Sequence, residues 1–188
     1  MMPAVLERTG LRGMTLSAWD LATTWLTLDK RQKMLDSVVL PILAMGGRVT
    51  LSFSPLPLKI SGILDVDVNS PMSMLALPAK KWEQLIAPVL MDQGQRIGRW
   101  QLGTVDMPDA FSMRKAPEVI AAIKRDFNNL APQPHLILPW RAHQSRRPEL
   151  KHVSEYLIDV PYAVRARHIG EHLGEWSIAP SETFSLHL

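Results

Sequence analysis

Apolar side chains recur every three or four residues over two N-terminal stretches of the chain, Thr15–Leu28 and Lys30–Ala44. This spacing places apolar residues on one face of a helix. The second stretch stops at Gly46-Gly47, and glycine commonly ends helices because it tolerates the backbone angles found there. We expect two helices that pack against the remainder of the domain through Trp19, Leu26, Leu35 and Val39.

Apolar and polar residues then alternate over Arg48–Val68, which is the pattern of half-buried strands. Pro55 and Pro57 interrupt the alternation, so two strands are expected rather than one. The same reasoning predicts the next elements in chain order: a strand over residues 72–78, a helix over Lys80–Met91 and a strand over residues 96–107.

The second half of the chain continues in mixed style. Pro117 opens a helical pattern over residues 117–130, with Pro at the first helical position and Glu118 in the first turn. Further along, the pattern predicts a buried strand over 135–140, a short helix over 147–161, and strands over Tyr162–Arg167 and Glu175–Leu188.

These elements predict an α+β fold in which N-terminal helices pack on a mostly antiparallel sheet with interspersed helices. Regular strand–helix–strand spacing is missing from the pattern, which disfavours a doubly wound parallel sheet. At 188 residues the length suits a single domain over 1–188. Residues 1–45 would be its helical part and 46–188 its mixed sheet and helix part.

Composition narrows the class of protein. Hydrophobic residues make up 46% and charged residues 21%, as in ordinary globular domains. There is no cysteine, so disulfides, thiol catalysis and cysteine-ligated zinc are excluded. No stretch reaches the 18 or so apolar residues of a transmembrane helix, and the N-terminus has no signal-peptide pattern. We therefore expect a cytoplasmic protein without a transmembrane segment.

One motif resembles a metal site in spacing. His168, Glu171 and His172 read H-x-x-E-H, the inverted zinc-protease signature. Gly170 and Gly174 disfavour the helix that would bring both imidazoles to one face, and few residues remain beyond His172 to supply a third ligand. We expect no metal there.

Two carboxylate patterns are also weak. Pro108-Asp109 with Glu149 and Lys151 is similar in spacing to a magnesium-dependent nuclease motif, but the pattern places Glu149 at a helix start, where acids complement the helix dipole. Asp65 and Asp67 would share a strand face, which is usually a solvated one. Phosphate-loop, dinucleotide and nucleophile-elbow motifs are absent from the sequence. We therefore expect no catalytic residue and no cofactor.

A basic segment carries the functional hypothesis. Arginine binds phosphate with two parallel hydrogen bonds, and an exposed tryptophan can stack on a base. Basic residues cluster around one tryptophan near the end of the chain, with few acids opposing them. The predicted nucleic-acid-binding residues are Trp140, Arg141, Arg146, Arg147, Lys151, Arg165 and Arg167.

We expect a non-enzymatic subunit of a larger complex that binds RNA or single-stranded DNA through this arginine-rich face. Ten methionines and six tryptophans suit protein contacts or self-association. One alternative is a metal-dependent nuclease or hydrolase. The other is a structural subunit, matrix-like or part of a secretion apparatus, whose basic face meets an anionic surface.

Overall fold

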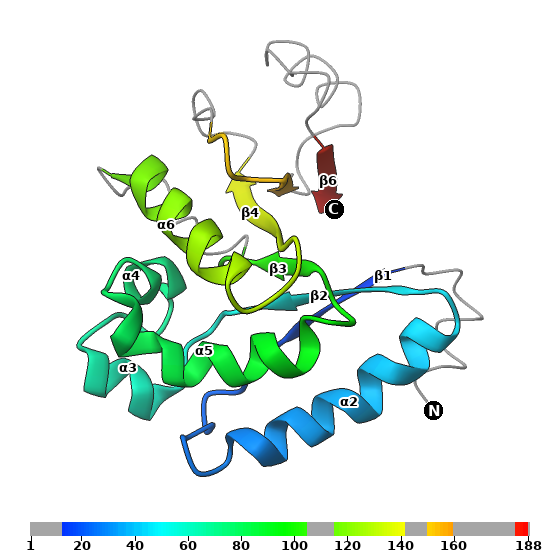
Figure 1. Cartoon of the computed structure of the whole chain (residues 1–188), viewed down its shortest axis with the longest axis horizontal. Helices are drawn as coiled ribbons and strands as arrows, with labels where there is room; N and C mark the ends of the chain where they lie inside the picture. The colour runs from blue at the N-terminus through cyan, green and yellow to red at the C-terminus, as the bar shows by residue number, and fades with distance from the viewer. Residues whose placement is uncertain (1–12, 105–114, 142–149, 160–182, 188) are drawn as a thin grey trace.

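A computed structural model describes residues 13–104, 115–141, 150–159 and 183–187 (Figure 1). The strands are β1 (Gly13–Ser17), β2 (Arg48–Ser52), β3 (Arg99–Gln101), β4 (His135–Arg141), β5 (Glu155–Asp159) and β6 (Thr183–His187). The helices are α2 (Leu28–Ala44), α3 (Leu58–Leu64), α4 (Pro71–Leu75), α5 (Ala79–Gln93) and α6 (Ala116–Asn128).

The six strands form one sheet in which every pair is parallel and the spatial order is the chain order, β1 to β6. A doubly wound sheet reverses its strand order at a switch point, and this sheet does not. Parallel strands added one after another in chain order, with helices between them, are the arrangement of a β/α barrel wall.

Helices α2, α5 and α6 lie along one side of this sheet (Figure 1). The residues of the sheet that pack with them are large and apolar: Leu51, Trp100 and Leu138 of the strands, and Phe53 directly after β2, each fully buried. Aromatic rings fill the centre: Phe53 stacks on Trp100 with centroids 5.6 Å apart, and Phe127 of α6 meets both rings edge-on. This layer is the core.

The opposite face of the sheet carries mainly polar residues, although the buried Ile137 of β4 also lies on it. Thr50, Ser52, Gln101 and Glu155 alternate with the core residues along their strands, and each is at most 8% exposed. A buried polar side of a parallel sheet corresponds to the interior of a β/α barrel, where side chains of alternate strand positions meet.

The predicted mostly antiparallel sheet is therefore wrong. Alternation of apolar and polar residues is typical of antiparallel strands with one solvated face, because buried parallel strands are usually apolar on both faces. Here the inner face is buried and yet polar, so it produces the same alternation. Alternation indicates that the two faces of a strand differ in polarity, but it does not indicate whether neighbouring strands run parallel or antiparallel.

Several predicted elements change type. Residues 15–28 were expected to be a helix but form β1 and a loop, and Leu26, expected in the core, is 95% exposed. The second expected strand within Arg48–Val68 is helix α3, and the strand expected over 72–78 is helix α4, which Ser70 caps by accepting from the amide of Ser73. The helix expected over 147–161 contains strand β5 instead.

Other elements are confirmed with small shifts. These are α2, α5 and α6, together with strands β2, β3, β4 and β6, which lie within the predicted ranges or within one or two residues of them. Trp19, Leu35 and Val39 are buried as expected. The strand expected over Tyr162–Arg167 lies outside the described residues, and the single-domain boundary stays a prediction.

Within the part of the chain that the structure describes, no helix combines the length and apolar character needed to cross a membrane.

Candidate binding site at the carboxyl edge of the sheet

The carboxyl ends of parallel strands meet at a single edge of the sheet, where β/α-barrel enzymes place their active sites. In this chain the ends of β1, β2 and β3 carry neutral polar residues: Ser17, Ser52 and Gln101. Ser52 Oγ donates to the carbonyl of Gly103 at 3.3 Å, and Gln101 Nε2 donates to the same oxygen at 2.7 Å. The loop after β3 is thus fixed against the end of β2.

Ser17 extends this network to β1. Its hydroxyl oxygen lies 2.5 Å from the carbonyl of Trp19 and 3.1 Å from the carbonyl of Ser54. The amide of Ser54 in turn donates to Ser52 Oγ at 3.3 Å. Short hydrogen bonds therefore hold the first three strand ends in a fixed arrangement, which is the preorganisation that a binding site requires.

The ends of β4, β5 and β6 carry ionisable residues. Arg141 of β4 pairs in register with Asp159 of β5, and Asp159 pairs with His187 of β6. Positions two residues apart in a strand share a face, so these three positions belong to the same face as Glu155, the polar one. In register these three positions lie four residues beyond the level of Ser17, Ser52 and Gln101, because Gln101 pairs with Ile137 and Ile137 with Glu155. The carboxyl ends thus carry hydroxyl and amide groups on three strands and, further along, one acidic and two basic positions on the next three.

A second polar cluster lies on the same face of the sheet, where Glu155 is level with Ser52 and Gln101, because Gln101 pairs with Ile137 and Ile137 pairs with Glu155. Glu155 is 2% exposed and accepts from Arg99 Nη2 at 2.6 Å and contacts His135 Nε2 at 3.1 Å, while Arg99 Nε donates to Thr50 Oγ1. Arg99, His135 and Glu155 each begin their strand. These contacts join β2, β3, β4 and β5 across the polar face, and we assign the cluster a role in holding the strands together.

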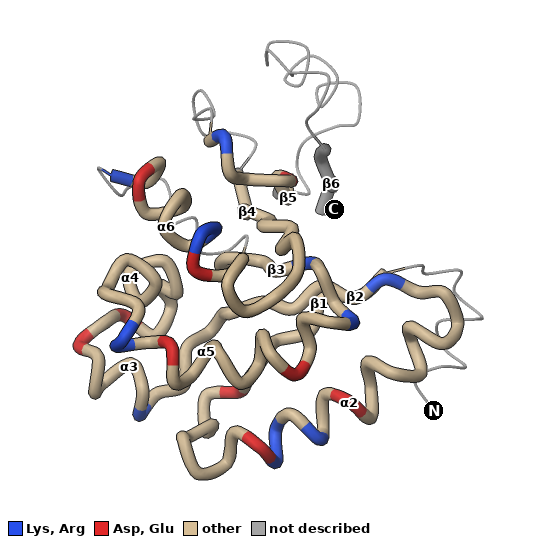
Figure 2. The backbone as a smooth tube through the Cα atoms, viewed as in Figure 1, with Lys and Arg blue, Asp and Glu red and all other residues tan. Residues whose placement is uncertain are grey.

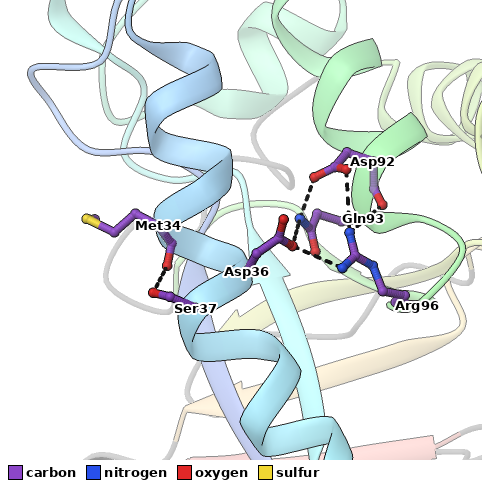
Figure 3. Close-up of polar contacts among 6 residues, drawn as sticks. All are labelled: Met34, Asp36, Ser37, Asp92, Gln93 and Arg96. Atoms are coloured by element: carbon purple, nitrogen blue, oxygen red, sulfur yellow. Dashed lines mark hydrogen bonds and ion pairs between the residues drawn. The ribbon is translucent and has the colours of Figure 1, made fainter.

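Helices α2 and α5 are joined by a third cluster (Figure 3). Gln93, fully buried, donates to Asp36 at 2.9 Å and to Asp92 at 2.7 Å, and Arg96 pairs with Asp36 at 3.1 Å. Both carboxylates are occupied by these partners. Among the described residues no group of three or more His, Asp or Glu is placed to hold a metal ion.

Basic and acidic positions both occur along α2 and α5, shown in blue and red in Figure 2.

Of the predicted nucleic-acid-binding residues, the structure describes Trp140, Arg141 and Lys151. Trp140 is 3% exposed and belongs to the core, so the exposure on which its stacking role depended is not met. Arg141 ends β4, and Lys151 lies exposed in the turn before β5. The remaining predicted residues lie outside the described residues: Arg146, Arg147, Arg165 and Arg167. The arginine-rich face therefore stays a prediction.

The weaker motifs fare similarly. His168, Glu171 and His172 lie outside the described residues, as do Asp109 and Glu149. Asp65 and Asp67 do not share a strand face: Asp65 ends α3 in a left-handed conformation with φ 54°, and Asp67 Oδ1 accepts from the amide of Asn69 in a turn.

Sequence reasoning missed Ser17, Ser52, Gln101, Asp159 and His187 as a group. Each is the last residue of its strand, so the positions of the strand ends are the signal that could have found them. The signal has meaning only once the strands are known to be parallel, since otherwise their carboxyl ends lie at opposite edges.

Comparisons with known proteins agree with this architecture. No protein-family model matches the chain, and no curated protein sequence matches it either. Among solved structures, it is similar to a Thermotoga maritima family 1 glycoside hydrolase complexed with a cyclophellitol analogue transition-state mimic, with a TM-score of 0.53 and 9% identity over 84% of this chain. It is also similar to a Thermotoga maritima β-glucosidase in complex with cyclophellitol, with a TM-score of 0.51 and 12% identity over 90% of this chain.

The similar region covers 52% of the first of those chains and 40% of the second, so this chain spans about half of their length or less. At such low identity the likeness concerns architecture. The strand order and these neighbours define the fold class as a barrel-like β/α fold.

Proposed function

We propose that this chain forms part of a β/α barrel that binds a saccharide at the carboxyl edge of its sheet. The observation that carries the proposal is the strand register, which brings Arg141, Asp159 and His187 to one level of that edge. Hydroxyl-rich ligands need both donors and acceptors, and the ends of β1, β2 and β3 carry residues of that chemistry, Ser17, Ser52 and Gln101. The saccharide class rests on the fold analogy with the two hydrolases.

Hydrolysis of a glycosidic bond is the associated activity to assay. Most glycosidases use two carboxyl groups on either side of the bond. Asp159 is the one acidic residue among the six described strand ends. In the sequence, Asp106 follows two residues after Thr104, the last described residue beyond β3. The binding proposal does not depend on a second acid.

Calorimetric titration of the full chain with cellobiose, a β-linked glucose disaccharide, tests the proposal. We expect Asp159→Asn to weaken binding about 10- to 150-fold, since a hydrogen bond to a charged group contributes about 1.5–3 kcal/mol. Glu118→Gln, at an exposed acid on α6, is the control and should bind like the parent. If the parent releases no heat with cellobiose or other β-glucosides at millimolar concentration, the proposal is wrong.

Nucleic-acid binding stays a second proposal. What supports it is the sequence cluster of arginines between Arg141 and Arg167, together with an exposed Lys151 and the position of Arg141 at a strand end. Measuring affinity over a range of salt concentrations distinguishes the two functions. Binding through phosphate contacts weakens steeply as salt rises, whereas binding of a neutral saccharide does not.

A further inference from the structure

Helix α2 lies at one end of the helix layer, beside α5 (Figure 1). Asp36 of α2 accepts a hydrogen bond from Gln93 of α5 at 2.9 Å and pairs with Arg96 at 3.1 Å. On the other side of α2, no helix lies among the described residues, because β1 is the first strand of the sheet in space as well as in sequence. One flank of α2 is therefore open in the described part of the chain.

Apolar residues line this open flank. Met34, Val38, Pro41 and Met45 follow one another at intervals of four, three and four residues, which places them in one row along the helix. Met34 is 52% and Met45 is 41% exposed, whereas Val38 and Pro41 are partly buried. Figure 3 shows the side chain of Met34 pointing away from α5, on the opposite side of α2 from Asp36.

The surface around this row is uncharged. In the sequence, Asp36 is the single charged residue between Lys33 and Arg48, and its carboxylate is engaged with α5. Exposed apolar residues that form a continuous patch are typical of a protein contact, and methionine adapts its shape to a partner surface.

The row is symmetric along the helix. Met34 and Met45 lie equally far from its midpoint, and so do Val38 and Pro41. Two copies of α2 that pack antiparallel about this midpoint place Met34 of each copy opposite Met45 of the other, and Val38 opposite Pro41. A contact that uses the same patch on both subunits requires such self-complementarity.

Charges at the two ends of α2 agree with the same arrangement. Lys30 and Lys33 are exposed at the amino end of the row. The last turn of α2 contains no basic residue, and its carbonyl groups carry partial negative charge. In the antiparallel pair, Lys33 of one copy lies at the level of Gly46 of the other, so that its ammonium group can reach those carbonyls.

We propose that two copies of this chain associate through the open flank of α2, as an antiparallel helix pair about a twofold axis. Each contact then occurs twice, once on either side of the axis. The proposal is independent of saccharide binding at the carboxyl edge of the sheet, so either one can fail without the other.

Sedimentation velocity of the full chain over a range of micromolar concentrations tests the pairing, and the parent should be a dimer. Met34→Glu and Met45→Lys should each weaken association about 30-fold or more, because each buries an unpaired charge on both copies. A double variant with Met34→Glu and Met45→Lys should recover the dimer. Only antiparallel packing places the new carboxylate of one copy opposite the new ammonium group of the other.

Leu40→Glu is the matched control, since Leu40 is also an exposed apolar residue of α2, at 46%. It precedes Pro41 by one residue and so lies about 100° around the helix from it, outside the row. This variant should associate like the parent, and circular dichroism should show that every variant is folded.

Three outcomes would overturn the pairing. If the parent stays monomeric, the row contacts a different protein. If both single variants associate like the parent, the copies meet through another surface. If the single variants are monomeric and the double variant does not recover the dimer, the two helices do not pack antiparallel about the midpoint of the row.

Discussion

The ion pair of Glu155 forms only because the fold brings residues of separate strands together. Glu155 is 2% exposed, two strands away from Arg99, and yet its carboxylate reaches the guanidinium at 2.6 Å. Side chains that meet across an intervening strand do so where a sheet curves toward them, which fits the inner wall of a barrel. A buried carboxylate of this kind is held by its partners, and its removal leaves them without a counter-charge.

Glu155→Gln should lower the free energy of unfolding by about 3 kcal/mol, because breaking a buried ion pair leaves an uncompensated charge. Urea denaturation followed by circular dichroism measures this. Glu118→Gln, at an exposed acid, should stay within about 0.5 kcal/mol of the parent. Equal stability of the two variants would mean that the cluster does not hold the strands together.

Gly94, which follows α5, is a second position where one residue decides packing. A Cβ added there would lie 2.6 Å from the Cβ of Ala131 and against the carbonyl of Leu90. Gly62 offers a matched comparison, since it lies inside α3 with nothing within 4 Å of an added Cβ.

Gly94→Ala should therefore destabilise the protein by about 1–3 kcal/mol, the usual cost of overpacking. Gly62→Ala should stabilise it by up to about 1 kcal/mol, because alanine favours a helix interior over glycine. Thermal denaturation of the two variants should shift in opposite directions. A shift in the same direction would contradict the packing described around Gly94.

At the scale of elements, the long helices were predictable and the short segments were not. Helices α2 and α5 carry apolar residues at helical spacing over 15 residues or more, so many positions agree. Helix α3 has seven residues and α4 has five, and so short a stretch fits either a helical or a strand pattern. The β1 region was mistaken for a helix because its apolar residues belong to two different structures, a strand and a loop.

Whether the basic segment between Arg141 and Arg167 binds phosphate is also a question at the scale of elements. If Arg146 and Arg147 contact phosphates, their joint replacement by Ala should make the log–log salt dependence of nucleic-acid binding shallower by roughly 1–2 units, at about 0.7 per phosphate on single strands and about 0.9 on duplex DNA. Filter binding across a salt series measures the slope. Lys80→Ala with Lys81→Ala, an exposed basic pair on α5, is the control.

An unchanged slope in the arginine variant would remove the nucleic-acid proposal and leave the saccharide site. Replacing Trp140 by Ala would not be informative about base stacking, because the residue is buried in the core. Its loss would lower the free energy of unfolding by about 3–5 kcal/mol.

At the scale of the whole molecule, strand direction was the missing information. The sequence pattern located most strands, yet whether neighbouring strands run together or in opposition depends on long-range pairing that no local pattern reports. The candidate site follows from strand direction: Ser17, Ser52 and Gln101 are unremarkable residues in sequence, and only parallel order brings them to one level of the sheet. This is why the fold was misassigned and the site was missed together.

The strand order also determines how the sheet is able to grow during synthesis. Each strand pairs with the one made just before it, so a strand leaving the ribosome finds its partner already folded. The aromatic cluster of Trp19, Phe53, Trp100 and Phe127 is complete once α6 has emerged, before β4 begins. Until β4 emerges and pairs with it, the outer edge of β3 presents unpaired backbone groups. In a nascent chain this edge is therefore open to wrong pairing with a strand of another chain.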